Sequence, residues 1–405
     1  MEAESAVAAK ATLPRNTYFF SAEPHPAGEL VGEFESSLVI GNGVVFFQFD
    51  DVAHAKEGGC EILILGHCYN PFSGEISQKV AAQLLCLWLK KGNDVFYDYL
   101  EEISGRFVIL LAESDGKLNV WGDACGTLPV CYHNNDSGIY LSSHAHFIKE
   151  AAGLQDDPLI TSLAKTKFYN LGIRHCPADL TEVEGVRMLT PNLQLSYESG
   201  SVEMSRIFPR AMREERPADE VVREVSQALK SSIQCLLSYK KPVLCALSGG
   251  VDSRISLAAT KGERESIAFF TFAGEGNASR DLECTRLLGE TLSLDFSAIN
   301  LPSVSEDRAF FNTYRCLQGE TRWPNAKETL QRLTYFGERD AFEIRSSVSE
   351  VARSFIKRKF HVKHLKLTPS NMVPLYKRVP FSKKWHSKLE NEFNKLMEKS
   401  EFKEV

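Results

Sequence analysis

The N-terminal half of the chain alternates short apolar runs with turn residues. Within residues 17–150 the runs are β-branched and aromatic, and turns such as Gly41-Asn42-Gly43 and Ser114-Asp115-Gly116 separate them. This pattern predicts strands. Two stretches with helical spacing, 76–92 and 94–104, interrupt them. The pattern therefore predicts an α+β domain in which stacked sheets carry helices.

The spacing changes after a polar linker at 211–220. Residues 218–239 place apolar side chains at helical intervals, which predicts an amphipathic helix. From 242 to 300, strand and helix patterns alternate, as in right-handed βαβ units with a parallel sheet. Residues 303–335 and 345–400 are predicted to be mainly helical.

The linker separates two expected domains, which suits a chain of 405 residues. The first domain, 17–210, ends in a predicted strand pair formed by 183–192 and 193–200. The second domain, 218–405, is an α/β parallel-sheet domain with a basic helical C-terminus.

Charge and cysteine usage narrow the possible partners and location. The formal charge of −6 gives no overall attraction to nucleic acid or an anionic membrane, yet 353–405 holds 14 Lys and Arg against 5 Glu. That tail is either a solvated helical face or a patch for a polyanion such as RNA. The ten cysteines form no C-x-x-C pair and suit reduced core positions. Because neither a signal peptide nor a membrane-length apolar stretch is evident, we expect a cytoplasmic protein.

One turn in the second half carries candidate chemistry. The stretch VLCALSGGVDSRISLAAT (243–260) runs from a buried strand through Ser248-Gly249-Gly250 into a helix. Glycine allows positive φ and close approach to a ligand, and the amides at a helix start cradle anions. Ser248 and Ser253 offer hydroxyls to phosphate, and Asp252 suits a magnesium ion that bridges the same phosphates. The plainer alternative is an ordinary strand–helix turn.

The hexapeptide SGGVDS resembles the PP-loop of ATP pyrophosphatases, over Leu247 to Ser253. It lacks the lysine of a Walker A loop. The resemblance implies binding of ATP and Mg²⁺ and attack of a substrate acid or carbonyl on the α-phosphate. Pyrophosphate then leaves, and an amine or sulfur nucleophile displaces AMP. Ala273 ends the second strand of this domain, where that family lays adenine against the main chain.

The first domain resembles the class II glutamine amidotransferase domain of asparagine synthetases, an Ntn-hydrolase-like sandwich. The match covers Gly105-Arg106-Phe107, the segment Asp123, Gly126, Pro129, Tyr132, and the stretch LSSHAHFIK. Of the family's Asn-Gly-Glu-x-Tyr-Asn loop only Tyr69-Asn70 remain, and LTPNLQL resembles its proline-containing hairpin. These features cover most of residues 60–300 in the family's order.

Two departures from that family bear on function. Its glutaminase uses an N-terminal cysteine, whereas residue 2 here is Glu and the first cysteine is Cys60. We therefore expect no glutamine hydrolysis, and the nitrogen comes from a substrate amine or from free ammonia. The family's Ser-Gly-x-Gly-x-Asp-Glu motif is also missing.

The stretch FEIRSSVSEVARSF (342–355) resembles the segment of shorter synthetase-like proteins that takes the place of that motif. On this basis Glu350 is assigned to a second metal or a substrate amine, with a surface ion pair as the alternative. Lys377, in YKRVPFSKKWHSK, is expected over the leaving pyrophosphate or on a docking surface. Arg254 either reaches a phosphate or lies on the surface.

Three functions are consistent with these patterns. The first is an ATP-dependent carbon–nitrogen ligase that joins a small-molecule or peptide carboxylate to an amine through an adenylate. The second is a PP-loop enzyme that modifies RNA through the basic tail. The third is a pseudoenzyme or partner subunit that binds nucleotide without turnover. The sequence leaves open whether the chain forms a homo-oligomer.

Overall fold

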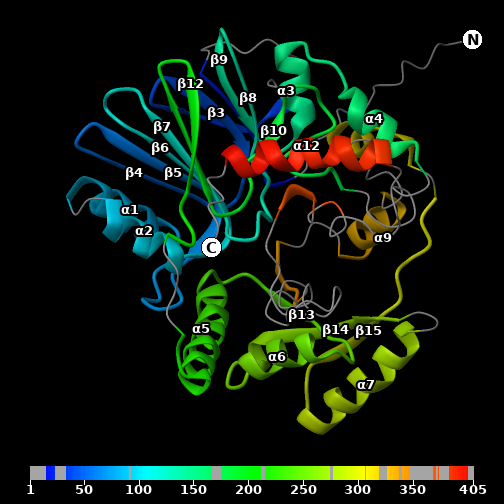
Figure 1. The fold of residues 1–405 in the computed structure, drawn as a ribbon. Coiled ribbons are helices and arrows are strands. Elements are labelled where there is room, and N and C mark those ends of the chain that lie inside the picture. Colours follow the sequence, from blue (N-terminus) through cyan, green and yellow to red (C-terminus); the bar gives the residue numbers. More distant parts are fainter. Residues whose placement is uncertain are drawn as a thin grey trace, which may run out of the picture.

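The structure is a computed structural model. It describes residues 15–22, 33–90, 93–166, 175–210, 215–273, 277–305, 307–318, 326–336, 340–346, 368–370, 373 and 383–399. These residues form two six-stranded antiparallel sheets and one four-stranded parallel sheet (Figure 1).

The first sheet has the order β10-β8-β9-β1-β3-β2. Its strands are β1 (Thr17–Ser21), β2 (Ser36–Ile40), β3 (Gly43–Gln48), β8 (Cys131–Asn135), β9 (Gly138–Ser142) and β10 (Arg187–Met188). The second sheet has the order β12-β11-β7-β6-β5-β4. Its strands are β4 (Val52–Glu57), β5 (Cys60–Tyr69), β6 (Ser104–Ala112), β7 (Leu118–Gly122), β11 (Leu193–Glu198) and β12 (Ser201–Arg206).

The two antiparallel sheets pack face to face, and helices cover their outer faces. On β5, Leu63 and Leu65 point into the core between the sheets, where Tyr18 of β1 also lies. The alternate residues Ile62 and Ile64 belong to a second core that includes the helices on the outer face. Because both faces are buried, residues 62–65 of β5 form a continuous apolar run instead of an alternating one. The outer helices are α1 (Gln78–Lys90), α2 (Asn93–Glu102) and α3 (Ala145–Ala152), and the short helix α4 (Pro158–Ala164) follows α3 in the chain.

Helix α3 forms the remaining layer, on the outer face of the first sheet. Phe19 and Tyr140 of that sheet pack against Phe147 and Ile148 of α3. The order of layers is therefore helix, sheet, sheet, helix. The sequence expectation of stacked sheets that carry helices is confirmed for the described residues.

The parallel sheet has the order β15-β14-β13-β16, with parallel pairing throughout. Its strands are β13 (Val243–Ala246), β14 (Ile267–Phe272), β15 (Phe296–Ile299) and β16 (Phe342–Ile344). The helices of this half are α5 (Ala218–Ser238), α6 (Val251–Ala259), α7 (Asn277–Leu292), α8 (Arg308–Gln318), α9 (Ala326–Phe336) and α12 (Lys383–Lys399), with a 3-10 turn at Arg264–Ser266. Alternation of β13, α6, β14, α7 and β15 confirms the predicted parallel α/β pattern.

Several local predictions were wrong. The predicted strand pair at 183–200 is instead the hairpin β11–β12, which turns at Ser199-Gly200, and only two residues of 183–192 form a strand. Strand β16 was not predicted, because it is only three residues long and polar residues follow it. The amphipathic helix α5 exists, but Val222 and Val225 on its apolar stripe are 62% and 51% exposed.

Several contacts join the two halves of the chain within the described ranges, and two of these places are set by polar side chains. The Tyr239 hydroxyl after α5 donates to the Cys68 carbonyl oxygen at 2.6 Å, and the Lys241 ammonium lies 2.9 Å from Asp51 and from Asp340. The C-terminal helix α12 lies beside β10 and α4 of the first half (Figure 1). There the Arg187 guanidinium donates at 3.1 Å to Glu392 of α12. The last helix predicted for the second domain therefore contacts the first.

Candidate functional site

The turn after β13 is anchored on the neighbouring strand. The Leu247 N–H donates to the Phe270 carbonyl at 2.8 Å, and the Leu247 carbonyl accepts from the Thr271 hydroxyl at 2.9 Å. Ser248, Gly249 and Gly250 follow at the carboxyl end of the strand, where open parallel sheets bind their ligands.

Helix α6 starts directly after this turn. Gly250 is its N-cap residue, with φ −74° and ψ 158°, and no described side chain caps it. Neither Gly249 nor Gly250 adopts positive φ, so that part of the sequence interpretation was wrong. Glycine matters here for space, since a Cβ on Gly249 would lie 3.0 Å from the Asp281 carboxylate. The helix start still presents its positive end at the turn.

The hydroxyl of Ser253 builds the turn from inside. Ser253 is 6% exposed, and its Oγ accepts from the Ser248 N–H at 3.1 Å. It also lies 3.0 Å from the Ser248 carbonyl oxygen and 3.0 Å from the Ser248 hydroxyl. Ser253 thus fixes the conformation of the turn, while the half-buried Ser248 hydroxyl lies nearer to solvent.

The other predicted residues of this region surround the turn. Asp252 is half-buried in the first turn of α6, where a negative charge interacts favourably with the helix dipole. Arg254 is exposed, and its Nε donates to the Gly250 carbonyl at 3.2 Å, which agrees with a surface position beside the turn. Ala273 follows β14 at the same sheet edge, and its N–H donates to Ile299 at 2.8 Å.

A carboxylate from the helix that follows β14 completes the turn. Asp281 lies inside α7, which begins at Asn277. Its Oδ1 accepts from the Gly249 N–H at 2.8 Å. The only sequence signal was an acid early in the helix that follows β14, which does not reveal a contact across the sheet edge.

Two predicted site residues, Glu350 and Lys377, lie outside the described residues. The described residues before Glu350 end at Ser346, which lies close to the turn. The Ser346 hydroxyl, just after β16, lies 2.7 Å from the Ser256 hydroxyl of α6. The Arg345 Nε, one residue after β16, donates to the Glu343 carboxylate of that strand at 2.7 Å. The chain therefore leaves β16 beside α6, at the edge that carries the turn.

The residues at the turn suit a magnesium ion bound together with phosphate. Within the described ranges no three His, Cys, Asp or Glu side chains gather as a metal cluster. Magnesium, however, needs only one or two protein carboxylates when phosphates and water complete its shell. Asp252 at the start of α6 offers such a carboxylate, and the ion would neutralise phosphate charge there.

Asp123, the acid of the amidotransferase-like motif in the first half, has a structural role. Asp123 is 1% exposed and accepts from the N–H groups of Cys125, Thr127 and Leu128 at 2.8 to 3.1 Å. The Thr127 hydroxyl donates a fourth bond at 3.0 Å. Asp123 therefore organises the loop between β7 and β8.

Gly105 and His67 lie close together where β5 pairs with β6. Gly105 has φ +138°, and a Cβ there would lie 2.2 Å from the His67 carbonyl oxygen. Only glycine fits this approach of the two backbones. The His67 ring packs 4.7 Å from the Phe342 ring of β16, and burial lowers the pKa of His67 to about 4.

Two histidines of the LSSHAHFIK stretch lie at the start of α3. The preceding strand, β9, ends at Ser142. His144 is the N-cap of α3, and His146 lies within that helix. The Ser143 hydroxyl lies 2.8 Å from His144 Nδ1.

Burial suppresses thiolate formation at several cysteines. Five of the nine cysteines whose surroundings the structure describes are buried: Cys60, Cys68, Cys131, Cys235 and Cys245. Burial raises the pKa of Cys68, Cys131 and Cys245 to about 12. Because the thiolate is the nucleophilic form, these three suit core positions better than catalysis.

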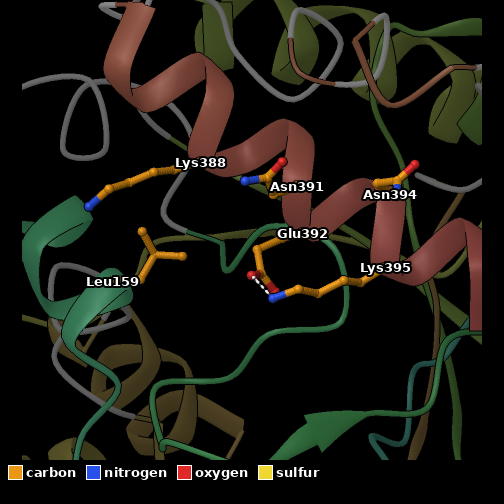
Figure 2. Close-up of a pocket in the computed structure, with 6 residues that line it drawn as sticks. All are labelled: Leu159, Lys388, Asn391, Glu392, Asn394 and Lys395. Atoms are coloured by element: carbon orange, nitrogen blue, oxygen red, sulfur yellow. Dashed lines mark hydrogen bonds and ion pairs between the residues drawn. The ribbon is translucent and has the colours of Figure 1, made fainter.

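An open hollow of about 440 Å³ lies away from the turn, between α4 and α12 (Figure 2). Its lining is Leu159, Lys388, Asn391, Glu392, Asn394 and Lys395. The Lys395 ammonium pairs with Glu392 at 2.7 Å, and Glu392 also accepts from Arg187. These charges satisfy one another and attach α12 to the first half.

No helix in the described ranges is both long and apolar enough to cross a bilayer.

Comparisons with known proteins give only a weak likeness. No protein-family model and no curated protein matches the chain. One similar solved structure is glutamine phosphoribosylpyrophosphate amidotransferase from B. subtilis complexed with ADP and GMP. It has 14% identity and a TM-score of 0.30, with 63% of this chain and 59% of that chain covered.

Another similar structure is described as the allosteric regulatory enzyme of purine biosynthesis. It has 13% identity and a TM-score of 0.29, with 63% of this chain and 58% of that chain covered. The match thus spans less than two thirds of each of these proteins. Scores at this level do not place the chain in a family, and kinship with asparagine synthetases stays a prediction.

Proposed function

We propose that the chain is an ATP-dependent, amide-forming ligase of the asparagine synthetase type. The observation that carries the proposal is the Ser248-Gly249-Gly250 turn, at the carboxyl end of a parallel strand and at the start of α6. Amides at a helix start bind phosphate, and the half-buried Ser248 hydroxyl could join them. The buried Ser253 hydroxyl is used within the turn. The SGGVDS resemblance adds cleavage between the α- and β-phosphates of ATP.

The proposed reaction has two steps. An oxygen of the substrate carboxylate attacks the α-phosphorus of ATP, and the bond to the β-phosphate breaks to release pyrophosphate. An amine then attacks the acyl carbon, an amide bond forms, AMP leaves, and the amine gives up one proton. In this scheme the turn holds the phosphates, Asp252 holds Mg²⁺, and Ala273 lies against adenine. Glu350 and Lys377 are assigned to the amine or second metal and to the pyrophosphate.

The nitrogen source in this proposal is a substrate amine or free ammonia. Supporting this, Cys68 and Cys131 of the first half are buried, with the pKa of each thiol raised to about 12. Cys125 is exposed as a residue, but partial burial of its thiol and the nearby Asp123 charge raise the pKa of this thiol as well. Such thiols make poor nucleophiles for glutamine hydrolysis.

A nucleotide-binding pseudoenzyme is the second candidate. The contact between Asp281 and the Gly249 amide favours it, because a carboxylate occupies a donor that a phosphate would use. A chain of this kind would bind ATP and release no pyrophosphate.

The test is pyrophosphate release from ATP and Mg²⁺, screened with amino acids and short peptides. The ligase predicts release that depends on a carboxylate and an amine and is lost in Asp252→Ala. The matched control is Glu265→Ala, which removes an exposed acid outside the turn and should keep the rate. Release stimulated by RNA alone would favour an RNA-modifying enzyme, and ATP binding without release would favour the pseudoenzyme.

A further inference from the structure

The backbone donors of the turn all have acceptors within the chain. The Ser248 N–H donates to Ser253 Oγ and the Gly250 N–H donates to Ser248 Oγ, at 3.1 and 3.2 Å. Both acceptors are neutral hydroxyls, one from the turn itself and one from the first turn of α6. The Gly249 N–H donates to Asp281 Oδ1 at 2.8 Å, so its acceptor is an ionisable group from a different element, α7.

The carboxylate of Asp281 stands where a phosphate oxygen would be bound. An ionised carboxylate and a phosphate oxygen are both anionic acceptors, and an N–H group binds either one with a charge-assisted bond. Asp252 places a second acid in the first turn of α6. A metal-free polyanion that binds at this turn must displace the Asp281 carboxylate from the Gly249 N–H. It then lies near the negative charges of both Asp281 and Asp252.

A divalent cation changes this balance. When Mg²⁺ is bound to the polyanion, it offsets the phosphate charge and attracts the carboxylates that repel the bare ligand. Asp252 and Asp281 therefore weaken binding of the metal-free ligand, whereas they leave binding of the magnesium complex unchanged or strengthen it.

We propose that Asp281 makes the turn selective for the magnesium complex of a nucleoside triphosphate or pyrophosphate over the metal-free anion. The inference rests on the proposed function, since it concerns the same phosphate site. It assigns Asp281 as a specificity-determining residue, in addition to its contact between α7 and the turn.

The test measures binding of inorganic pyrophosphate by calorimetry, once with Mg²⁺ and once with EDTA. The variants are Asp281→Asn, which keeps an oxygen near Gly249 but loses the charge, and Asp281→Ala, which also frees the amide. The matched control is Glu290→Gln, which removes an exposed charge from the same helix. Thermal unfolding confirms that each variant is folded.

Selectivity predicts that metal-free pyrophosphate binds about ten-fold more tightly to Asp281→Asn, which corresponds to about 1.4 kcal/mol, and more tightly still to Asp281→Ala. The affinity ratio with and without Mg²⁺ should fall, and Glu290→Gln should match the original chain. Unchanged or weaker metal-free binding in both folded variants would overturn the inference and identify Asp281 as a structural contact only.

The outcomes separate this inference from the proposed ligase. If Mg²⁺-pyrophosphate and ATP bind and selectivity follows Asp281, but no substrate releases pyrophosphate, the ligase fails and the inference stands. If pyrophosphate release occurs and the ratio does not depend on Asp281, the ligase stands and the inference fails. Absence of any binding, with or without Mg²⁺, contradicts both.

Discussion

Replacing Asp123 with alanine should destabilise the chain strongly. The carboxylate is 1% exposed and accepts four hydrogen bonds, three from backbone N–H groups and one from the Thr127 hydroxyl. Each bond to a charged group contributes about 1.5–3 kcal/mol, and buried donors left without an acceptor add a desolvation cost. The four bonds form one network, so their contributions do not add. We expect a loss of about 3–5 kcal/mol in the free energy of unfolding.

Urea denaturation followed by fluorescence measures this loss. Asp123→Asn should cost less than Asp123→Ala, because one amide oxygen can still accept from the backbone. Asp136→Ala, at an exposed position in the turn between β8 and β9, is the matched control and should change the free energy of unfolding by no more than about 0.5 kcal/mol. A loss below about 1 kcal/mol for Asp123→Ala would refute the structural role that we assign to this acid.

Three further changes test the fold. Tyr239→Phe removes the hydroxyl that donates to the Cys68 carbonyl and accepts from Ser77. This change should lower the free energy of unfolding, measured by urea denaturation, by about 1–2 kcal/mol. Gly105→Ala meets a carbonyl oxygen at 2.2 Å with φ at +138° and should lower the melting temperature by several degrees or prevent folding. Burial lowers the pKa of His67 from about 6.5 to about 4, so the unfolded chain takes up this proton first. Stability should therefore fall between pH 6.5 and 4, and less steeply in His67→Gln; equal slopes would contradict the burial argument.

The elements that were predicted well are those whose pattern reflects a local cause. The run of apolar residues in β13 and the glycines after it determine where the strand ends and α6 begins, and the structure agrees within two residues. Helix α1 was likewise expected at 76–92 and is observed at Gln78–Lys90, because its apolar face is buried under the second sheet.

The errors arose where long-range contacts decide. Two-residue strand β10 and three-residue strand β16 are too short to show a period, and they exist because β8 and β13 offer edges to pair with. The turn residues Ser248 to Ser253 were predicted together, but the bond from Gly249 to Asp281 spans the sheet edge and has no sequence period. Glu350 and Lys377 lie outside the described residues, so their roles stay predictions.

The most direct test of the central claim is a crystal structure of the chain with Mg²⁺ and a non-hydrolysable ATP analogue. We expect phosphate density against the amides of Gly249 and Gly250, a magnesium ion beside Asp252, and the base near Ala273. Nucleotide bound elsewhere, with Asp281 still on the Gly249 amide, would show that this turn is not the phosphate site.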